Sequence, residues 1–284
     1  MGLRQMKKDV RLVAGPWVGE FGWELFAWQA HIRALSRGYK ETVVICRPST
    51  KELYSDFASD FILHSPSGGP ADQWFRLEYD LNKNINQLIT ANEDVFTSCA
   101  IDYLTPRQLG VPNNGVTHFS EKVQVGHSHL VPEYIKFTGH TEKKFDIVFH
   151  ARSRQIRKQD NWSPAEWEEL ANKFILEGKT ICSIGTKKES LVVPGSADMR
   201  ECDMGTLFGV LNSCSGVFGP SSGPMHLASL CGAPHVVWSE SKNHKRYTST
   251  WNPLNTPVLF LDEFGWHPKP EYIYSKYSNW IKEK

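Results

Sequence analysis

The sequence lacks the features that mark several large classes of protein. Its six cysteines include no C-x-x-C pair, which argues against a disulfide scaffold and favours a reducing compartment. Its formal net charge is only +1, from 32 Lys and Arg against 31 Asp and Glu, so no global basic field attracts nucleic acid. No apolar run is long enough for a signal peptide or a membrane span. We therefore expect a cytoplasmic protein without a transmembrane segment.

What is present is the composition of an ordinary globular protein with many aromatic side chains. Of its 284 residues, 40% are hydrophobic, 22% are charged and 12% are aromatic, and ten are tryptophan. A chain of this length can form one large domain or two of ordinary size. Aromatic side chains contribute strongly to core packing, and they also bind flat, ring-shaped ligands. Both interpretations of the tryptophans stay open at this point.

Short apolar runs alternate with helical patterns in two parts of the chain. This alternation is typical of parallel sheets with crossover helices, so the predicted fold class is α/β. The predicted strands cover residues 10–14, 42–46, 61–63, 145–150, 179–184, 216–219, 235–238 and 257–261. The predicted helices cover residues 24–37, 51–59, 164–176, 205–212, 224–231 and 270–284. We expect a first domain over 1–140, with mixed structure after residue 65, a second over 141–265, and a C-terminal helix within 266–284 that packs back on the first domain.

Residues 217–238 are the most informative stretch, because they predict a strand, a glycine-rich turn, a helix and a second strand. The turn at 219–224 contains two serines and two glycines, and Pro224 suits the first position of a helix. His226 would then lie in the first helical turn. The start of a helix has unpaired N–H groups and attracts anions, so this turn predicts a site for a phosphate-bearing ligand. The alternative for His226 is a role in the core or in capping.

Two basic clusters also follow predicted strands. The first comes after the strand at 145–150 and the second after the strand at 235–238. Loops at the carboxyl ends of parallel strands are where α/β sheets bind ligands, so both clusters are candidates for phosphate contacts. The alternative is a solvated surface. The clusters consist of Arg152, Arg154, Arg157 and Lys158, and of Lys242, His244, Lys245 and Arg246. From position alone, Gly185 and Thr186 at the end of another strand are candidates for nucleotide contacts.

Residues 221–229 read S-S-G-P-M-H-L-A-S, and Pro234 precedes the strand at 235–238. This pattern resembles the donor-site motif D-[ST]-G-x-x-H of glycosyltransferases with the GT-B fold, especially the ADP-heptose:lipopolysaccharide heptosyltransferases. Residues 162–167, W-S-P-A-E-W, stand where that family has a W-P-x-x-x-W helix start. The resemblance lies mainly in the C-terminal half. It implies a GT-B-like fold of two Rossmann-like parallel-sheet domains that face a cleft.

The resemblance implies that a nucleotide-diphosphate sugar binds to the second domain. The donor-binding residues would be Ser221, Ser222, Gly223, Met225, His226, Arg152, Arg154, Lys158, Gly185 and Thr186. Further contacts to phosphate or acceptor would come from Lys242, Lys245 and Arg246. The sequence has no D-x-D motif for a divalent ion, so we expect no metal and no cofactor, with helix N-termini and basic side chains neutralising the diphosphate. His127 and His129 have ligand-like spacing, but no cysteine lies nearby and the signal for a metal is poor.

Inverting sugar transfer needs a base that takes the proton of the acceptor hydroxyl. In the family that the chain resembles, the base is an acidic residue in a G-D loop. Counting back from Leu35 places this residue at Glu24. Glu20 is the alternative base, and Glu24 could instead be a charge partner of a helix N-terminus.

The chain departs from the family pattern at two positions. Ser221 stands where the family has Asp, which implies that the donor sugar is not a heptose. Gly205 stands where the family has the acidic residue that holds the ribose, so Asp203 or Glu201 would have to substitute for it.

These observations predict a metal-independent, inverting glycosyltransferase of the hexosyl or pentosyl transferase class, with a nucleotide-sugar as co-substrate. The acceptor hydroxyl would belong to a saccharide, or to a hydroxymethylated base in DNA, as in phage DNA-modifying glycosyltransferases that share the GT-B fold. A non-catalytic nucleotide-sugar-binding module on the same scaffold is the alternative, and the loss of the motif Asp supports it. A pyruvyl- or fucosyl-type transferase of related architecture is a third interpretation.

Overall fold

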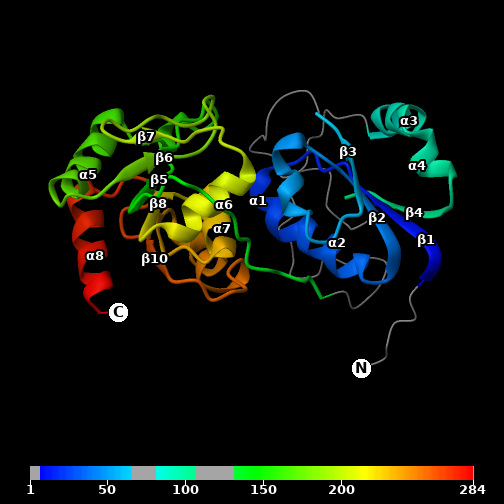
Figure 1. Cartoon of the computed structure of the whole chain (residues 1–284). Coiled ribbons are helices and arrows are strands. Elements are labelled where there is room, and N and C mark those ends of the chain that lie inside the picture. Colours follow the sequence, from blue (N-terminus) through cyan, green and yellow to red (C-terminus); the bar gives the residue numbers. More distant parts are fainter. Residues whose placement is uncertain (1–6, 66–80, 107–130, 284) are drawn as a thin grey trace. The chain divides into compact units, whose positions relative to one another are not determined.

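The structure is a computed structural model that describes residues 7–65, 81–106 and 131–283. The chain divides into two compact units, Met1–Glu133 and Tyr134–Lys284, which we describe one at a time (Figure 1). The division comes a few residues before the predicted boundary at 140, because the backbone N–H of Phe137 already bonds to the carbonyl of Leu230 in the second unit, at 2.9 Å. None of the described helices has the length and hydrophobicity that a membrane span requires.

The first unit is built on a parallel sheet of four strands in the order β3-β2-β1-β4. The strands are β1 (Lys7–Ala14), β2 (Tyr39–Cys46), β3 (Asp60–Leu63) and β4 (Ala100–Leu104). The first three confirm predicted strands, and β4 falls in the region whose pattern predicts only mixed structure. Because all four strands run parallel, their carboxyl ends share one edge of the sheet.

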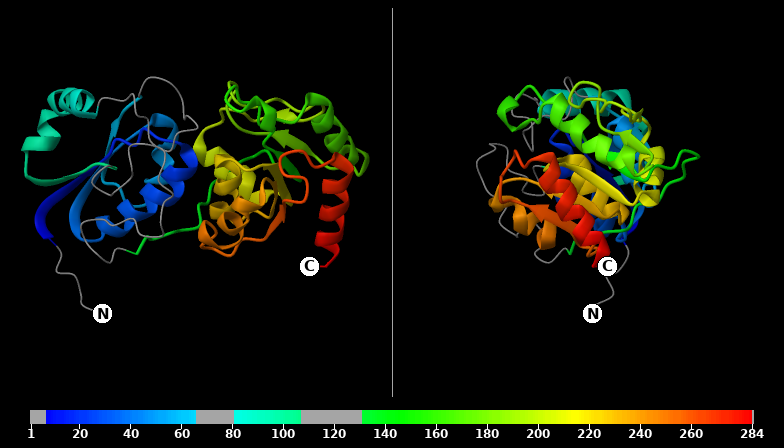
Figure 2. Two further views of the ribbon diagram at one scale, coloured as in Figure 1. Left: turned by 180° about the vertical axis from the view of Figure 1, so that it is seen from behind. Right: turned by 90° about the vertical axis from the view of Figure 1, so that its left-hand side faces the viewer.

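Helices of the first unit cover both faces of its sheet (Figures 1 and 2). On one face, Leu88, Val95 and Phe96 pack against a buried apolar layer that includes Val13 and Val43. The helices are α1 (Phe21–Trp23), the π-helix η1 (Glu24–Trp28), α2 (Gln29–Ser36), the 3₁₀-helix η2 (Pro48–Leu53), α3 (Leu81–Ala91) and α4 (Glu93–Thr97). The predicted helix at 24–37 therefore begins earlier and contains a π turn, and the one at 51–59 is replaced by η2.

The second unit is built on a parallel sheet of six strands in the order β10-β9-β8-β5-β6-β7. Counted within this unit, the order is that of a Rossmann fold, and it reverses between β5 and β8. Such a switch point is where open α/β sheets bind ligands, at the carboxyl ends of the strands. The strands are β5 (Ile147–Phe149), β6 (Ile181–Ser183), β7 (Ala197–Asp198), β8 (Gly216–Pro220), β9 (His235–Trp238) and β10 (Val258–Leu261). The sequence patterns missed the very short β7.

The helices of the second unit confirm most of the predicted ones. Ser163 and Glu166 form a capping box at the start of the predicted helix over 164–176. In it the Ser163 hydroxyl accepts from the Glu166 N–H at 3.3 Å and the Glu166 carboxylate accepts from the Ser163 N–H at 2.7 Å. The helices are α5 (Pro164–Leu176), α6 (Met204–Ser213), α7 (Gly223–Cys231), α8 (Pro270–Lys282), the 3₁₀-helices η3 (Lys158–Asp160) and η4 (Ser241–Asn243), and the π-helix η5 (Arg246–Thr250).

Helix α8 belongs to the core of the second unit. Ile273 and Tyr277 are buried in the same apolar cluster as Phe174 of α5 and Phe218 of β8, and the Tyr277 ring meets that of Phe218 at 4.8 Å. Both views in Figure 2 place α8 alongside α5. Within its own unit, the aromatic face of α8 is complementary to the aromatic cluster between α5 and β8. The packing of the C-terminal helix on the first domain stays a prediction.

Candidate functional site

The switch point of the second unit brings together the loops after β5 and β8. His150 follows β5 directly, and the β8–α7 turn (residues 221–224) follows β8. All four residues of this turn are partly exposed, whereas Met225 and the rest of α7 are buried. The predicted anion turn therefore lies where the fold places ligands.

The start of α7 has two N–H groups that are open. The first helical bond runs from the His226 N–H to the Ser222 carbonyl at 3.2 Å, and Pro224 has no N–H. Within the described part of the chain, neither the Gly223 N–H nor the Met225 N–H has a hydrogen-bond partner. Open amides at a helix N-terminus carry partial positive charge and suit an anion.

Ser222 occupies the N-cap position of α7 without capping it. Its side chain makes no bond to the helix, and its hydroxyl instead lies 2.9 Å from Nδ1 of His150. Serine at an N-cap usually accepts from the second or third N–H of the helix. The bond to His150 therefore keeps the Met225 N–H open.

His150 is a neutral, tightly enclosed histidine. A Cβ atom on Gly185 would lie 3.0 Å from His150 Cδ2, and one on Gly219 would lie 3.3 Å from His150 Cβ. Burial, together with the positive charges of Arg152 and Arg154, lowers the pKa of His150 to about 3. Its ring is thus uncharged at neutral pH and acts on Ser222 through a hydrogen bond alone.

Tyr247 of η5 joins the same turn from another part of the chain. Its hydroxyl accepts from the Ser222 N–H at 3.0 Å and donates to the Ser221 hydroxyl at 3.1 Å. The ring is 1% exposed and stacks on His226, with centroids 4.1 Å apart and 12° between the planes. Burial raises the pKa of Tyr247 to about 12, so the phenol keeps its proton.

Arg152 is buried beneath the β8–α7 turn and donates a hydrogen bond to it. We predicted it as a phosphate ligand, but its side chain is 3% exposed. It donates to the Ser221 carbonyl at 2.9 Å and to the Asp160 carbonyl at 2.7 Å, and its guanidinium lies 4.7 Å from the centre of the Trp266 ring. Its charge therefore lies just behind the turn.

The other basic candidates differ in exposure. Arg154 pairs with the carboxylate of Asp160 at 3.1 Å, and Lys242 pairs with Glu240. Lys158 and Lys245 are exposed on the loops after β5 and β9. Arg246 is half-buried, with its guanidinium 4.6 Å from the centre of the Trp251 ring. Lys158 and Lys245 are thus among the predicted cations that lie at the surface of the second unit.

His226 and Met225, both predicted donor ligands, have their side chains in the core. His226 is 3% exposed, and its ring meets that of Trp251 at 4.7 Å in addition to its stack on Tyr247. Burial lowers its pKa well below the ordinary value. The alternative interpretation, a core histidine, therefore describes the His226 side chain, whereas Met225 keeps an open backbone N–H.

Gly185 and Thr186 form part of the loop after β6. Gly185 has a φ of 121°, and a Cβ there would lie 2.6 Å from the Ser190 hydroxyl, so glycine is required. The Thr186 carbonyl accepts from the Ser190 N–H at 3.0 Å, while its side chain is exposed. Of the two substitutes for a ribose-binding acid, Asp203 caps α6 by accepting from the Thr206 N–H at 2.8 Å.

In the first unit, Glu24 lies at the start of η1 and is 0% exposed. Its carboxylate accepts from the hydroxyls of Tyr54 at 2.7 Å and Thr50 at 2.9 Å, and Arg47 Nη1 lies at 3.4 Å. Burial raises the pKa of Glu24, against the opposing effect of Arg47 and the hydrogen bonds. The Glu24 carboxylate is thus enclosed by its own unit.

Glu20 has a different environment. It is the N-cap residue of α1 and is partly exposed. Its carbonyl accepts from the Glu24 N–H at 3.1 Å and from Trp17 Nε1 at 3.3 Å, while Arg47 Nη2 donates to the adjacent Gly19 carbonyl at 3.2 Å. The backbone of Glu20 is therefore fixed by the same buried cluster that encloses Glu24.

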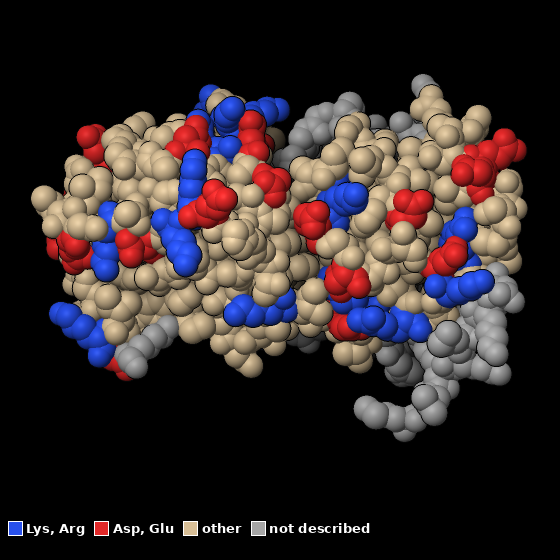
Figure 3. Space-filling model, in the orientation of Figure 1, with Lys and Arg blue, Asp and Glu red and all other residues tan. Residues whose placement is uncertain are grey.

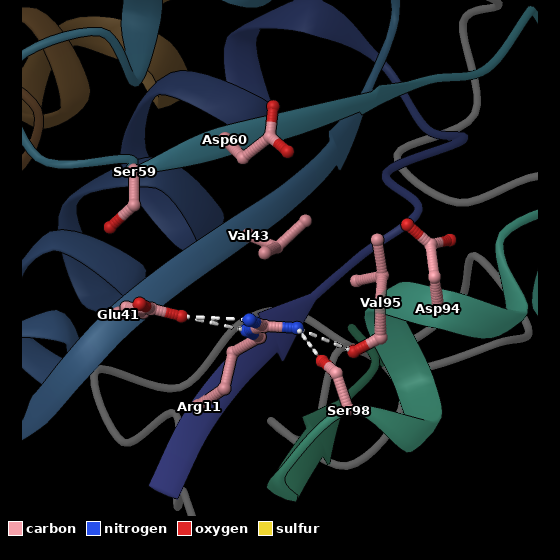
Figure 4. A pocket seen from close by; sticks show the side chains of 8 residues that line it. All are labelled: Arg11, Glu41, Val43, Ser59, Asp60, Asp94, Val95 and Ser98. Carbon is pink, nitrogen blue, oxygen red and sulfur yellow. Dashed lines mark hydrogen bonds and ion pairs between the residues drawn. The ribbon is translucent and has the colours of Figure 1, made fainter. Parts of the chain in front are cut away.

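A cavity of about 360 Å³ lies elsewhere in the first unit (Figure 4). Arg11 crosses it and bonds to Glu41 at 2.8 Å and to the Val95 carbonyl at 2.8 Å. Glu41 and Asp60 stand near the beginnings of β2 and β3, so the cavity faces the amino ends of the strands. This is the edge opposite to the one where parallel sheets bind ligands.

Among the described residues, no group of three or more His, Cys, Asp or Glu side chains could hold a metal ion. His127 and His129 lie outside the described residues.

Sequence reasoning missed three residues that shape the turn, namely His150, Tyr247 and Trp266. His150 carried a usable signal, because it is a polar residue that ends an apolar strand at the ligand-binding edge. Tyr247 and Trp266 carried none, since their partners lie far away in the sequence.

Two parallel-sheet α/β units, of which the second has Rossmann order and an open helix N-terminus at its switch point, define a GT-B-like architecture. Solved structures of this class resemble the chain. It is similar to a glycosyltransferase family 9 protein from Veillonella parvula, with a TM-score of 0.63 and 12% identity over 100% of this chain and 99% of that one.

Two Escherichia coli enzymes are similar as well. ADP-heptose lipopolysaccharide heptosyltransferase II gives a TM-score of 0.59 and 13% identity over 96% of this chain and 99% of that one. Heptosyltransferase WaaC with ADP gives a TM-score of 0.57 and 11% identity over 95% of this chain and 99% of that one. No protein-family model and no curated protein sequence matches the chain. At these identities the likeness establishes the fold, so the predicted fold class and the resemblance to heptosyltransferases in fold are confirmed.

Proposed function

We propose that this protein is a glycosyltransferase that moves a sugar from a nucleotide-diphosphate sugar to a hydroxyl acceptor without a metal ion. The observation that carries the proposal is the pair of open amide groups of Gly223 and Met225 at the switch point of the second unit. The fold shared with three glycosyltransferase structures supports it, and one of these structures holds ADP.

The chemistry of sugar transfer explains why such a turn matters. As the bond between the anomeric carbon and the diphosphate breaks, negative charge grows on the leaving oxygen. Fixed N–H donors and the dipole of α7 would stabilise that charge, and fixed donors of this kind often contribute about 3 kcal/mol each to a transition state. Lys158 and Lys245, exposed on neighbouring loops, would add positive charge from side chains.

The proton of the acceptor hydroxyl must also leave as the new glycosidic bond forms. A base has to reach that hydroxyl within hydrogen-bond distance. Glu24 is fully enclosed by Arg47, Thr50 and Tyr54, whereas Glu20 is partly exposed. We therefore assign the role of base to Glu20, and attack from the face opposite the diphosphate would invert the anomeric centre.

For the acceptor, we favour a saccharide hydroxyl over a base in DNA. On the face shown in Figure 3, lysines and arginines alternate with acidic residues. Among the described residues, several form ion pairs, such as Arg200 with Asp198 at 2.9 Å. Binding to DNA depends on many cations facing phosphates, which makes it strongly salt-dependent. DNA affinity that falls steeply with added salt would instead support the DNA acceptor.

A thermal-shift screen of the full chain with UDP-, GDP-, ADP-, CMP- and dTDP-sugars tests the proposal. A ligand that binds only the folded state raises its apparent stability, by about 2.7 kcal/mol at one hundred times Kd. We expect one nucleotide-sugar to raise the melting temperature in the presence of EDTA. Binding without any donor turnover, in the wild type and in Glu20→Gln alike, would favour a non-catalytic module.

A further inference from the structure

We propose that Tyr247 is a positioning residue for the β8–α7 turn: it orients the Ser221 hydroxyl so that its hydrogen faces outward, toward an oxygen of the bound diphosphate. This inference rests on the function proposed above. It assigns a task to a residue that lies outside the glycine-rich turn in the sequence and does not itself touch the ligand.

The Tyr247 ring is held in one place. His226 stacks on it with centroids 4.1 Å apart, and Phe260 lies at 5.6 Å with 34° between the planes. The ring is 1% exposed, so the direction of its hydroxyl is set by packing and not by solvent. His226 therefore helps to hold Tyr247 in position, which explains why a buried histidine occurs in the first turns of α7.

The hydroxyl of Tyr247 connects the two serines of the turn. It accepts the Ser222 N–H at 3.0 Å, and its own hydrogen is directed to the Ser221 hydroxyl at 3.1 Å. A second acceptor, the Ser222 carbonyl, lies farther away at 3.4 Å. Since burial raises the pKa of Tyr247 to about 12, the phenol remains a donor at neutral pH.

The other polar groups of Ser221 are occupied as well. Its N–H donates to the Trp238 carbonyl at 3.0 Å, and its carbonyl accepts from Arg152 at 2.9 Å. Because the Ser221 oxygen accepts from Tyr247, the hydroxyl hydrogen must point elsewhere, and Ser221 is partly exposed. The turn then offers three donors to a ligand, namely the Ser221 hydroxyl and the amides of Gly223 and Met225. This set matches the oxygens of a diphosphate.

A double-mutant cycle on the full chain tests the inference. Calorimetric titration with ADP, GDP, UDP, CDP and dTDP first identifies the nucleoside diphosphate that the wild type binds. Tyr247→Phe keeps the ring and its stack on His226, and Ser221→Ala removes the hydroxyl that Tyr247 orients. Tyr272→Phe is the matched control, because it removes a tyrosine hydroxyl that donates to Glu263 on the surface of the same unit.

We expect Kd to rise about tenfold in Tyr247→Phe and in Ser221→Ala, which is the usual effect of losing one hydrogen bond. If Tyr247 acts through Ser221, the double variant is also weakened only about tenfold. A hundredfold loss in the double variant, or unchanged affinity in Tyr247→Phe, would overturn the inference while leaving the proposed function intact. Failure of the folded wild type to bind any of the five diphosphates would overturn both.

Discussion

The Ser222 hydroxyl lies 2.9 Å from Nδ1 of His150, and this bond joins the ends of two neighbouring strands, β5 and β8. It uses the N-cap serine of α7 for a contact outside the helix. Because Pro224 has no N–H, the Met225 N–H is the one group that a capping Ser222 could bind.

His150→Leu tests what this bond does. Leucine fills a similar volume but accepts no hydrogen bond, so Ser222 becomes free to cap the Met225 N–H. We expect nucleoside-diphosphate affinity to fall several-fold, because one donor of the turn is then occupied. Calorimetric titration measures the effect.

The second substitution, Ser222→Ala, provides the control for this prediction. Adding it to His150→Leu removes the competing hydroxyl and should restore most of the lost affinity. If the double variant binds as weakly as His150→Leu, competition between the Ser222 hydroxyl and the ligand for the Met225 N–H does not cause the loss of affinity.

The two glutamates of the first unit should respond differently to removal of charge. Glu20→Gln should lower transfer activity by about 10²- to 10⁴-fold, because general bases contribute this much. Glu24→Gln should leave more than a tenth of the activity, since the amide oxygen can still accept from Thr50 and Tyr54. Turnover of the nucleotide-sugar identified by the thermal-shift screen is the measurement. Loss of activity in Glu24→Gln with full activity in Glu20→Gln would reverse the assignment.

Much of this organisation could be predicted from the sequence. The strand–turn–helix pattern around Pro224 and the alternation of strands and helices gave the α/β fold class, because buried parallel strands are continuous apolar runs bounded by turn residues. The capping box at Ser163 follows a pattern that the sequence shows, since its two partners are three residues apart.

The environment of Glu24 could have been predicted as well. Glu24 precedes Trp28 by four residues and Ile32 by eight, so it shares the apolar stripe of its helix. Tyr247 is different, because it meets Ser222 across 25 positions of sequence, and only the folded sheet brings them together. The π turn in η1 could not be predicted either, because the spacing of apolar residues does not indicate it.

Burial of Glu24 predicts a pH dependence of stability. Its pKa is raised in the folded protein above the unfolded value of about 4.3. A group shifted in this direction contributes stability fully below its unfolded pKa and loses that contribution as pH rises through the folded pKa. Relative to Glu24→Gln, the wild type should therefore lose stability as pH rises above about 4.3. Urea unfolding of both proteins across this range measures the difference, and a relative gain in stability would contradict it.

Gly185 packs closely against the ring of His150. Its φ of 121° and the 2.6 Å approach to the Ser190 hydroxyl predict that Gly185→Ala costs about 1–3 kcal/mol in the free energy of unfolding. Gly178→Ala is the matched control, because Gly178 has a φ of 75° with no heavy atom within 4 Å of the added Cβ among the described residues. Urea unfolding should show the larger loss for Gly185→Ala, and equal losses would mean that backbone conformation alone explains the effect.

The central claim is that the open amides at the start of α7 hold a diphosphate. The most direct measurement is an amide ¹⁵N–¹H spectrum of the full chain, titrated in the presence of EDTA with the nucleoside diphosphate that binds. We predict that the Gly223 and Met225 resonances move downfield with the same Kd that calorimetry reports. If the nucleotide binds while both resonances stay in place, the diphosphate lies elsewhere and the account is wrong.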